Sequence, residues 1–109
     1  HPIVQELTTN LRSSKAQLDA VSQQLSRLER QEMLAKVTTS ELESYPTDQV
    51  WRSCGKAFVL QDKSKYVQDL KHDETLLKDQ TKALRIKKNY LETTVEKLVM
   101  NLKASLEKR

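Results

Sequence analysis

The sequence predicts a mainly α fold, an antiparallel intramolecular coiled-coil helical hairpin with a β-hairpin inserted between its two long helices. Three observations carry this prediction. Apolar residues recur at alternating spacings of three and four on both sides of the middle of the chain. The only glycine, cysteine, tryptophan and phenylalanine all lie within residues 50–60. Hydrophobic residues make up 37% and aromatic residues 5% of 109 residues, which suits a narrow seam within a single domain.

The first predicted element is a coiled-coil helix over residues 3–37. With Val4 at heptad position a and Leu7 at position d, the repeat continues with one polar interruption at Ser14. No proline or glycine interrupts the segment, and its length would be roughly 50 Å. Such a helix is too long for a small globular core, which favours one strand of a coiled coil.

Residues 38–48 are predicted to form a short helix and a turn. Here the heptad pattern ends, and Ser40 and Glu43 have the spacing of a capping box. Pro46 is expected to end this short helix, because it pushes Tyr45 toward extended geometry. Thr47 and Asp48 then suit a turn.

Residues 49–60 are predicted to form a β-hairpin that joins this chain to others. Gly55 can take the positive φ that a tight hairpin turn requires. The second strand is apolar on both faces, and two strands alone are marginally stable, so other chains must supply further strands. The candidate oligomerisation residues are Val50, Trp51, Cys54, Gly55, Ala57, Phe58, Val59 and Leu60.

Residues 62–108 are predicted to form the returning coiled-coil helix. Leucines recur every seven residues from Leu70 to Leu98 at position d. The a positions in the middle of this helix are polar, and Glu74 and Lys88 would stack on their own copies in a parallel homodimer. That arrangement would cost stability at several layers, which favours pairing within the chain.

The two predicted helices match best as an antiparallel pair within one chain, because five layers then set apolar residues against apolar residues. The predicted register places Val4 against Leu98, Leu7 against Val95, Leu11 against Leu91, Leu18 against Leu84, and Leu25 against Leu77. The seam is therefore assigned to Leu11, Leu18, Leu25, Leu77, Leu84 and Leu91. Both chain ends would lie together, away from the β-hairpin.

Two apolar sets lie outside the seam. Ile3, Val99, Met100 and Leu106 gather near the chain ends, as either a packed or frayed tip or an exposed surface for adaptable contacts. Leu76, Ala83, Ile86 and Tyr90 are predicted to widen the intramolecular seam, with contact to a neighbouring subunit as the alternative.

The sequence offers little catalytic chemistry, and we expect no enzyme, cofactor or metal site. His72 has no second histidine or cysteine at ligand spacing, and Cys54 has no nearby histidine, so a small packed residue is favoured over a nucleophile. No dense basic segment precedes the leucine heptads, which argues against nucleic-acid binding by a basic zipper. No apolar run is long enough for a membrane span.

These residues resemble a known family. A coiled coil, one β-hairpin and a returning coiled coil are the plan of a β-type prefoldin subunit, and the resemblance covers essentially the whole chain. It is carried by residues 43–67 (ESYPTDQVWRSCGKAFVLQDKSKYV) and 87–98 (KKNYLETTVEKL). The glycine-containing hairpin followed by FVLQ is the specific part, because heptads alone occur in many proteins.

The resemblance implies a cytoplasmic, ATP-independent co-chaperone with two α-type and four β-type subunits, joined by their hairpins. Such complexes hold unfolded actin and tubulin and pass them to the cytosolic chaperonin. By this resemblance the client-binding tip would comprise Ile3, Val4, Leu7, Leu98, Val99, Met100, Leu102 and Leu106. A structural coiled-coil scaffold or tether without client binding is the alternative, and a related complex with a nuclear assignment stays open.

Overall fold

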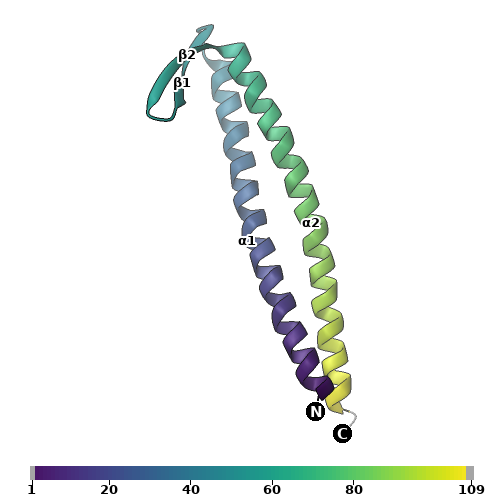
Figure 1. The fold of residues 1–109 in the computed structure, drawn as a ribbon. Coiled ribbons are helices and arrows are strands. Elements are labelled where there is room, and N and C mark those ends of the chain that lie inside the picture. Colours follow the sequence, from purple (N-terminus) through teal and green to yellow (C-terminus); the bar gives the residue numbers. More distant parts are fainter. Residues whose placement is uncertain (1, 108–109) are drawn as a thin grey trace. The chain divides into compact units, whose positions relative to one another are not determined.

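Two long helices pack antiparallel with a β-hairpin between them, which confirms the predicted fold class. The computed structural model describes residues 2–107, in the order α1 (Pro2–Ser44), β1 (Gln49–Cys54), β2 (Ala57–Asp62) and α2 (Lys63–Glu107) (Figure 1). The chain divides into two compact units. We call residues 1–27 with 81–109 the terminal unit, and residues 28–80 the hairpin unit.

In the terminal unit, the start of α1 and the end of α2 lie side by side (Figure 1). The residues at positions a and d of both helices are buried or half-buried, and most others are exposed. Val21, Leu25 and Leu91 are the buried apolar residues. Burial of this apolar stripe drives the pairing, because a long amphipathic helix gains most of its stability from packing.

The structure differs from the prediction between residues 38 and 44, where α1 continues without a break to Ser44. The predicted seam continues as well, since Thr39 is buried and Leu42 half-buried. The Thr39 hydroxyl donates to the Ala35 carbonyl oxygen at 2.8 Å, so its polar group is satisfied inside the helix. The helix ends where the Tyr45 amide donates to the Leu42 carbonyl oxygen at 3.1 Å, just before Pro46.

The predicted register between the helices is wrong by one heptad. Glu43 Oε1 and Lys71 Nζ form an ion pair at 3.0 Å in the hairpin unit. In the predicted register Lys71 would lie opposite Gln31, about twelve residues or about 18 Å along the helix axis from Glu43. Sliding α2 by seven residues keeps seam positions facing one another and brings the two charges within reach. The bounds of the terminal unit, residues 1–27 with 81–109, agree with the same shift.

In the corrected register Leu18 faces Leu91 and Leu25 faces Leu84 in the terminal unit. These layers agree with the burial of Leu25 and Leu91. In the hairpin unit the same register sets Leu42 against Val67, both half-buried. The seam therefore extends through the last turn of α1.

Two seam positions in the hairpin unit hold glutamates, and both reach solvent in the same way. Glu32 pairs with Lys36 at 3.6 Å, and Glu74 pairs with Lys78 at 3.5 Å, each four residues further along its helix. The glutamate stems lie in the seam while the carboxylates reach its edge, where a lysine meets them. A polar residue at position a is thus accommodated without an unpaired buried charge.

The β-hairpin has two antiparallel strands joined by a two-residue turn, Gly55–Lys56. Cys54 pairs with Ala57 next to the turn, and Gln49 pairs with Asp62 at the open end. Gly55 has a φ of 63°, and no other described residue has a positive φ. A positive φ at the first turn position alone defines a type II′ turn, whose twist matches that of the strands.

Candidate interaction surfaces

The outer face of the β-hairpin is apolar and exposed. The strand register places Trp51 beside Leu60, and Ser53 beside Phe58, on one face. Trp51 is 67% exposed, Phe58 70% and Leu60 47%. Aromatic residues of this size are seldom left in water on a two-stranded ribbon, because their burial is a main source of strand stability. This face is therefore a surface built to be covered.

The opposite face of the hairpin is anchored to α2 through Arg52. Its Nη1 donates to Asp69 Oδ2 at 2.9 Å and to Gln61 Oε1 at 3.3 Å. The guanidinium also lies over the Tyr66 ring, 4.6 Å from its centroid. A planar guanidinium can satisfy a carboxylate and stack on an aromatic ring at once. Arg52 therefore fixes which face of the hairpin points away from the helix.

Lys63, the first residue of α2, ties down the connection between α1 and β1. Its backbone amide donates to the Asp48 carbonyl oxygen at 2.7 Å, and its Nζ donates to the Tyr45 carbonyl oxygen at 2.7 Å. The first bond uses a backbone amide that the start of a helix leaves without an intrahelical partner. Together the two bonds hold residues 45–48 against the base of the hairpin.

A hollow of about 450 Å³ lies at this base, continuous with the outer face. Tyr45 and Trp51 line it, and both are exposed. The remaining lining residues are Leu42, Thr47, Gln49 and Val50. The outer face and this hollow together form one apolar surface in the hairpin unit.

The predicted tip residues divide into two groups in the terminal unit. Ile3, Met100 and Leu106 are exposed. The others are half-buried, most of them in the seam: Val4, Leu7, Leu98, Val99 and Leu102. An exposed methionine and two aliphatic side chains thus lie above a packed seam, which leaves apolar surface open to a partner.

The residues considered for chemistry lie apart from one another. Cys54 and His72 are both exposed, on the hairpin and on α2. Within residues 2–107, no three histidine, cysteine or acidic side chains are grouped closely enough to hold a metal ion. Over the same residues, no helix has both the length and the hydropathy needed to cross a bilayer.

Comparison with known proteins accounts for this architecture. A family model described as prefoldin subunit matches residues 5–109. The chain belongs to the prefoldin family. It is 68% identical over 105 residues to prefoldin subunit 1 of Saccharomyces cerevisiae, a match that covers 96% of each protein. It is 30% identical over 106 residues to prefoldin subunit beta of Pyrococcus abyssi, covering 96% of this chain and 91% of that protein.

A solved structure agrees with this membership. The prefoldin beta subunit from Thermococcus strain KS-1 has a TM-score of 0.90 and 29% sequence identity, covering 97% of this chain and 94% of that one. The chain is thus a β-type prefoldin subunit, as its resemblance implied. Prefoldin is a non-enzymatic co-chaperone that delivers unfolded actin and tubulin to the chaperonin, and this chain is one of its subunits.

The structure brings some of the sequence-predicted hairpin residues together and separates others. Trp51, Phe58 and Leu60 form the outer face, whereas Val50 and Val59 belong to the opposite face. Cys54 and Ala57 flank the turn on that opposite face, and Gly55 supplies the turn itself. The predicted oligomerisation residues therefore lie in one β-hairpin but are divided between its outer face, which carries the large side chains, and its opposite face.

Sequence reasoning missed the Arg52 anchor and a second exposed apolar group. Arg52, Tyr66 and Asp69 are separated along the chain, and no periodic pattern links a strand arginine to them. Met33, Leu34 and Val37 are exposed on α1 in the hairpin unit. Their heptad positions, b, c and f, lie opposite the seam, so the extended heptad pattern would have revealed them.

The prediction that Leu76, Ala83, Ile86 and Tyr90 widen the seam is wrong. All four are exposed. They occupy positions c and f, on the side of α2 opposite the seam, because the seam is formed by positions a and d alone.

Proposed function

We propose that the chain joins a heterohexamer of two α-type and four β-type prefoldin subunits through its β-hairpin. The outer face supports this proposal most directly, because Trp51, Phe58 and Leu60 are exposed in the isolated chain. Further strands from neighbouring subunits would cover this face and pair the free strand edges. Large aromatic anchors surrounded by smaller contacts are also the usual composition of an assembly hot spot.

In the terminal unit, we propose that the apolar tip residues hold unfolded actin or tubulin in the cytoplasm without ATP. Ile3, Met100 and Leu106 offer exposed, adaptable apolar contacts. Each contact would be weak, but several subunits acting on one client raise its effective affinity while each arm can still release. The hexamer would then pass the client to the cytosolic chaperonin.

The tip assignment is tested by changing Val99 and Met100 together to serine in the assembled hexamer. We expect at least a threefold loss in suppression of actin aggregation without ATP, because apolar contact area is removed. Native mass spectrometry should show an intact hexamer. Met33→Ser is a matched control, since Met33 is equally exposed but lies in the hairpin unit.

Two results would contradict the proposal. If the double variant suppresses aggregation as well as the natural chain, the tip does not hold the client. If the natural chain with its partner subunits gives no suppression at all, the chain acts as a scaffold or tether.

A further inference from the structure

The strongest unexplained feature is a row of exposed residues on the side of α2 opposite the seam. We call this row the outer stripe, and it comprises Ala83, Ile86, Tyr90, Thr93, Lys97 and Met100. All six lie in the terminal unit. Ile86 is 67% exposed and Tyr90 71%, although both are large apolar residues. No described residue covers them.

The spacing of the outer stripe is that of a helix-packing seam. Its members follow one another at alternating intervals of three and four residues, the same period as positions a and d. Such a row runs straight along a helix for about 25 Å. This geometry fits another helix laid alongside α2 better than an extended strand or a small molecule.

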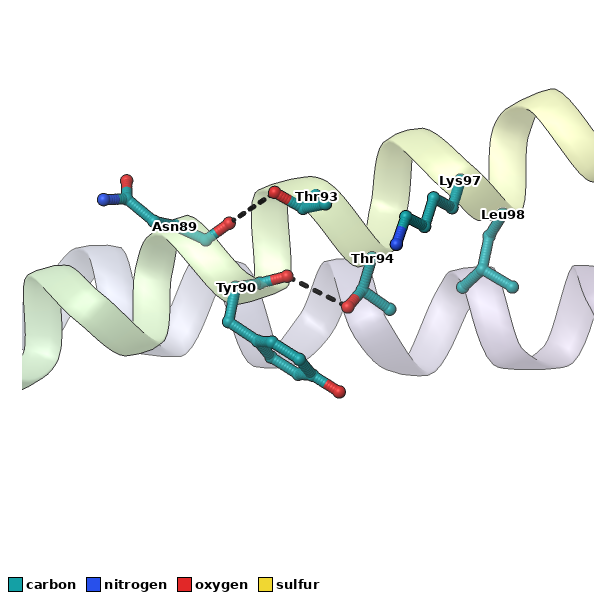
Figure 2. A pocket seen from close by; sticks show the side chains of 6 residues that line it. All are labelled: Asn89, Tyr90, Thr93, Thr94, Lys97 and Leu98. Atoms are coloured by element: carbon teal, nitrogen blue, oxygen red, sulfur yellow. Dashed lines mark hydrogen bonds between the residues drawn. The ribbon is translucent and has the colours of Figure 1, made fainter.

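A hollow of about 460 Å³ interrupts the stripe beside Tyr90. Tyr90 and Leu98 stand at its two ends with Thr94 between them, and Asn89, Thr93 and Lys97 complete the lining (Figure 2). The hydroxyls of Thr93 and Thr94 donate to the carbonyl oxygens of Asn89 and Tyr90 at 3.0 and 2.9 Å. Because these hydroxyls are already satisfied, the hollow can accept an apolar side chain without leaving them unpaired.

The charge around the stripe is positive. Lys82, Lys87 and Lys103 occupy the b and g positions that flank it, and Lys97 lies within it. Among the b and g positions between residues 82 and 103, one residue is acidic, Glu96. None of these lysines forms an ion pair within residues 2–107. A partner with acidic side chains beside an apolar ridge would complement this pattern.

We propose that the outer stripe binds an amphipathic helical segment of an unfolded client, with apolar residues on the stripe and aspartate or glutamate beside them. This inference rests on the proposed client-holding function and adds a second contact to the tip. The apolar spacing selects a helix, the hollow beside Tyr90 takes its largest apolar side chain, and the lysines select acidic flanks. Helical segments of this kind would be held along the arm rather than only at its end.

The test uses the assembled hexamer and two synthetic helical peptides with the same apolar positions. One peptide carries glutamate at the flanking positions and the other carries lysine. Fluorescence anisotropy should show at least tenfold tighter binding of the glutamate peptide, with the difference shrinking as salt is added. Ile86→Ser with Tyr90→Ser should weaken binding of the glutamate peptide at least tenfold. Met33→Ser with Leu34→Ser, two exposed residues of the hairpin unit, should leave it unchanged.

A charge-reversed variant gives the sharper result. Lys87→Glu with Lys97→Glu should reverse the preference, so that the lysine peptide binds more tightly. Equal binding of both peptides to the natural hexamer, or no effect of the Ile86 and Tyr90 substitutions, would overturn the proposal. Loss of the hexamer in native mass spectrometry on substituting Ile86 and Tyr90 would also overturn it, because the stripe would then be a surface between subunits.

The outcomes separate this inference from the proposed function. If the natural hexamer suppresses actin aggregation but binds neither peptide, the outer stripe proposal fails and the client-holding function stands. If the hexamer neither suppresses aggregation nor binds the peptides, both fail. The Val99 and Met100 variant loses one residue of the outer stripe, Met100. It should therefore bind the glutamate peptide more weakly than the natural hexamer but more tightly than the Ile86 and Tyr90 variant.

Discussion

The hairpin unit and the terminal unit are stabilised by different means. In the terminal unit, leucines and valines occupy most seam positions, and Val21, Leu25 and Leu91 are buried. In the hairpin unit, the seam includes Glu32 and Glu74, and polar ties hold the elements together. Those ties join Glu43 to Lys71, Arg52 to Asp69, and Lys63 to the preceding loop.

This difference indicates that one chain can use its hairpin unit for assembly and its terminal unit for client contact. The hairpin unit exposes the large aromatic side chains of its outer face and depends on other chains to cover them. The terminal unit can remain paired while its exposed apolar residues stay free for transient contacts. Substitutions should therefore act on assembly in the first unit and on chain stability or client binding in the second.

The largest expected effect on assembly comes from Trp51→Ala combined with Phe58→Ala. Removing both anchors should weaken incorporation into the hexamer by more than about 2 kcal/mol, or at least roughly thirtyfold. The helical content of the isolated chain should change little, because both rings are mostly exposed there. Native mass spectrometry and circular dichroism provide the two readouts. Met33→Ala is the control, since Met33 is exposed in the same unit but lies outside this surface. Normal assembly of the double variant would refute the role of the outer face.

A large effect on chain stability is expected from Leu91→Ala in the terminal unit. Leu91 is 4% exposed, so its truncation should lower the free energy of unfolding by about 3 kcal/mol. Urea unfolding followed by circular dichroism measures this change. Met100→Ala, on the exposed side of the same helix, should change it by less than about 0.5 kcal/mol. Equal losses in the two variants would mean that the seam does not run through Leu91.

A gain in stability is expected from Thr81→Val. Thr81 is 1% exposed, and its hydroxyl has no hydrogen-bond partner within residues 2–107. Replacing a buried, unpaired hydroxyl by a methyl group of similar shape should raise the free energy of unfolding by about 1 kcal/mol. The same urea experiment checks it, with the exposed Thr93→Val as control. A loss of stability in Thr81→Val would show that the hydroxyl is satisfied in solution.

The smallest effect is expected from Lys71→Ala, which removes the ion pair with Glu43. Both side chains are half exposed, so the free energy of unfolding should fall by about 0.5 kcal/mol, and the loss should vanish in 1 M salt. Lys65→Ala is the control, because Lys65 is exposed and forms no ion pair within residues 2–107. A loss that persists in high salt would point to packing of the lysine stem instead.

Much of the fold could be predicted because a seven-residue apolar period has few structural solutions. Even the location of the polar residues Glu74, Thr81 and Lys88 in the seam is predicted by the seven-residue spacing of position a. The same period explains the error in register, because a heptad pattern matches itself after a shift of seven residues. Only a specific pair such as Glu43 and Lys71 distinguishes the two alignments.

Other features could not be predicted because they depend on contacts between unlike elements. The break predicted at residue 38 is absent because the seam continues through Thr39 and Leu42, with the Thr39 hydroxyl satisfied inside its own helix. The Arg52 anchor joins a strand to a helix through single side chains. Ile86 and Tyr90 were predicted to widen the seam because they are apolar. They are exposed instead, because positions a and d alone form the seam.

The central claim is that the outer face of the hairpin is covered only in the assembly, and Trp51 reports on it directly as the only tryptophan of the chain. The measurement is its fluorescence emission and acrylamide quenching, before and after mixing with partner subunits whose tryptophans are replaced by phenylalanine. We predict water-exposed emission with strong quenching in the isolated chain, and a blue shift with strong protection in the hexamer. Unchanged emission and quenching in an intact hexamer would contradict the account.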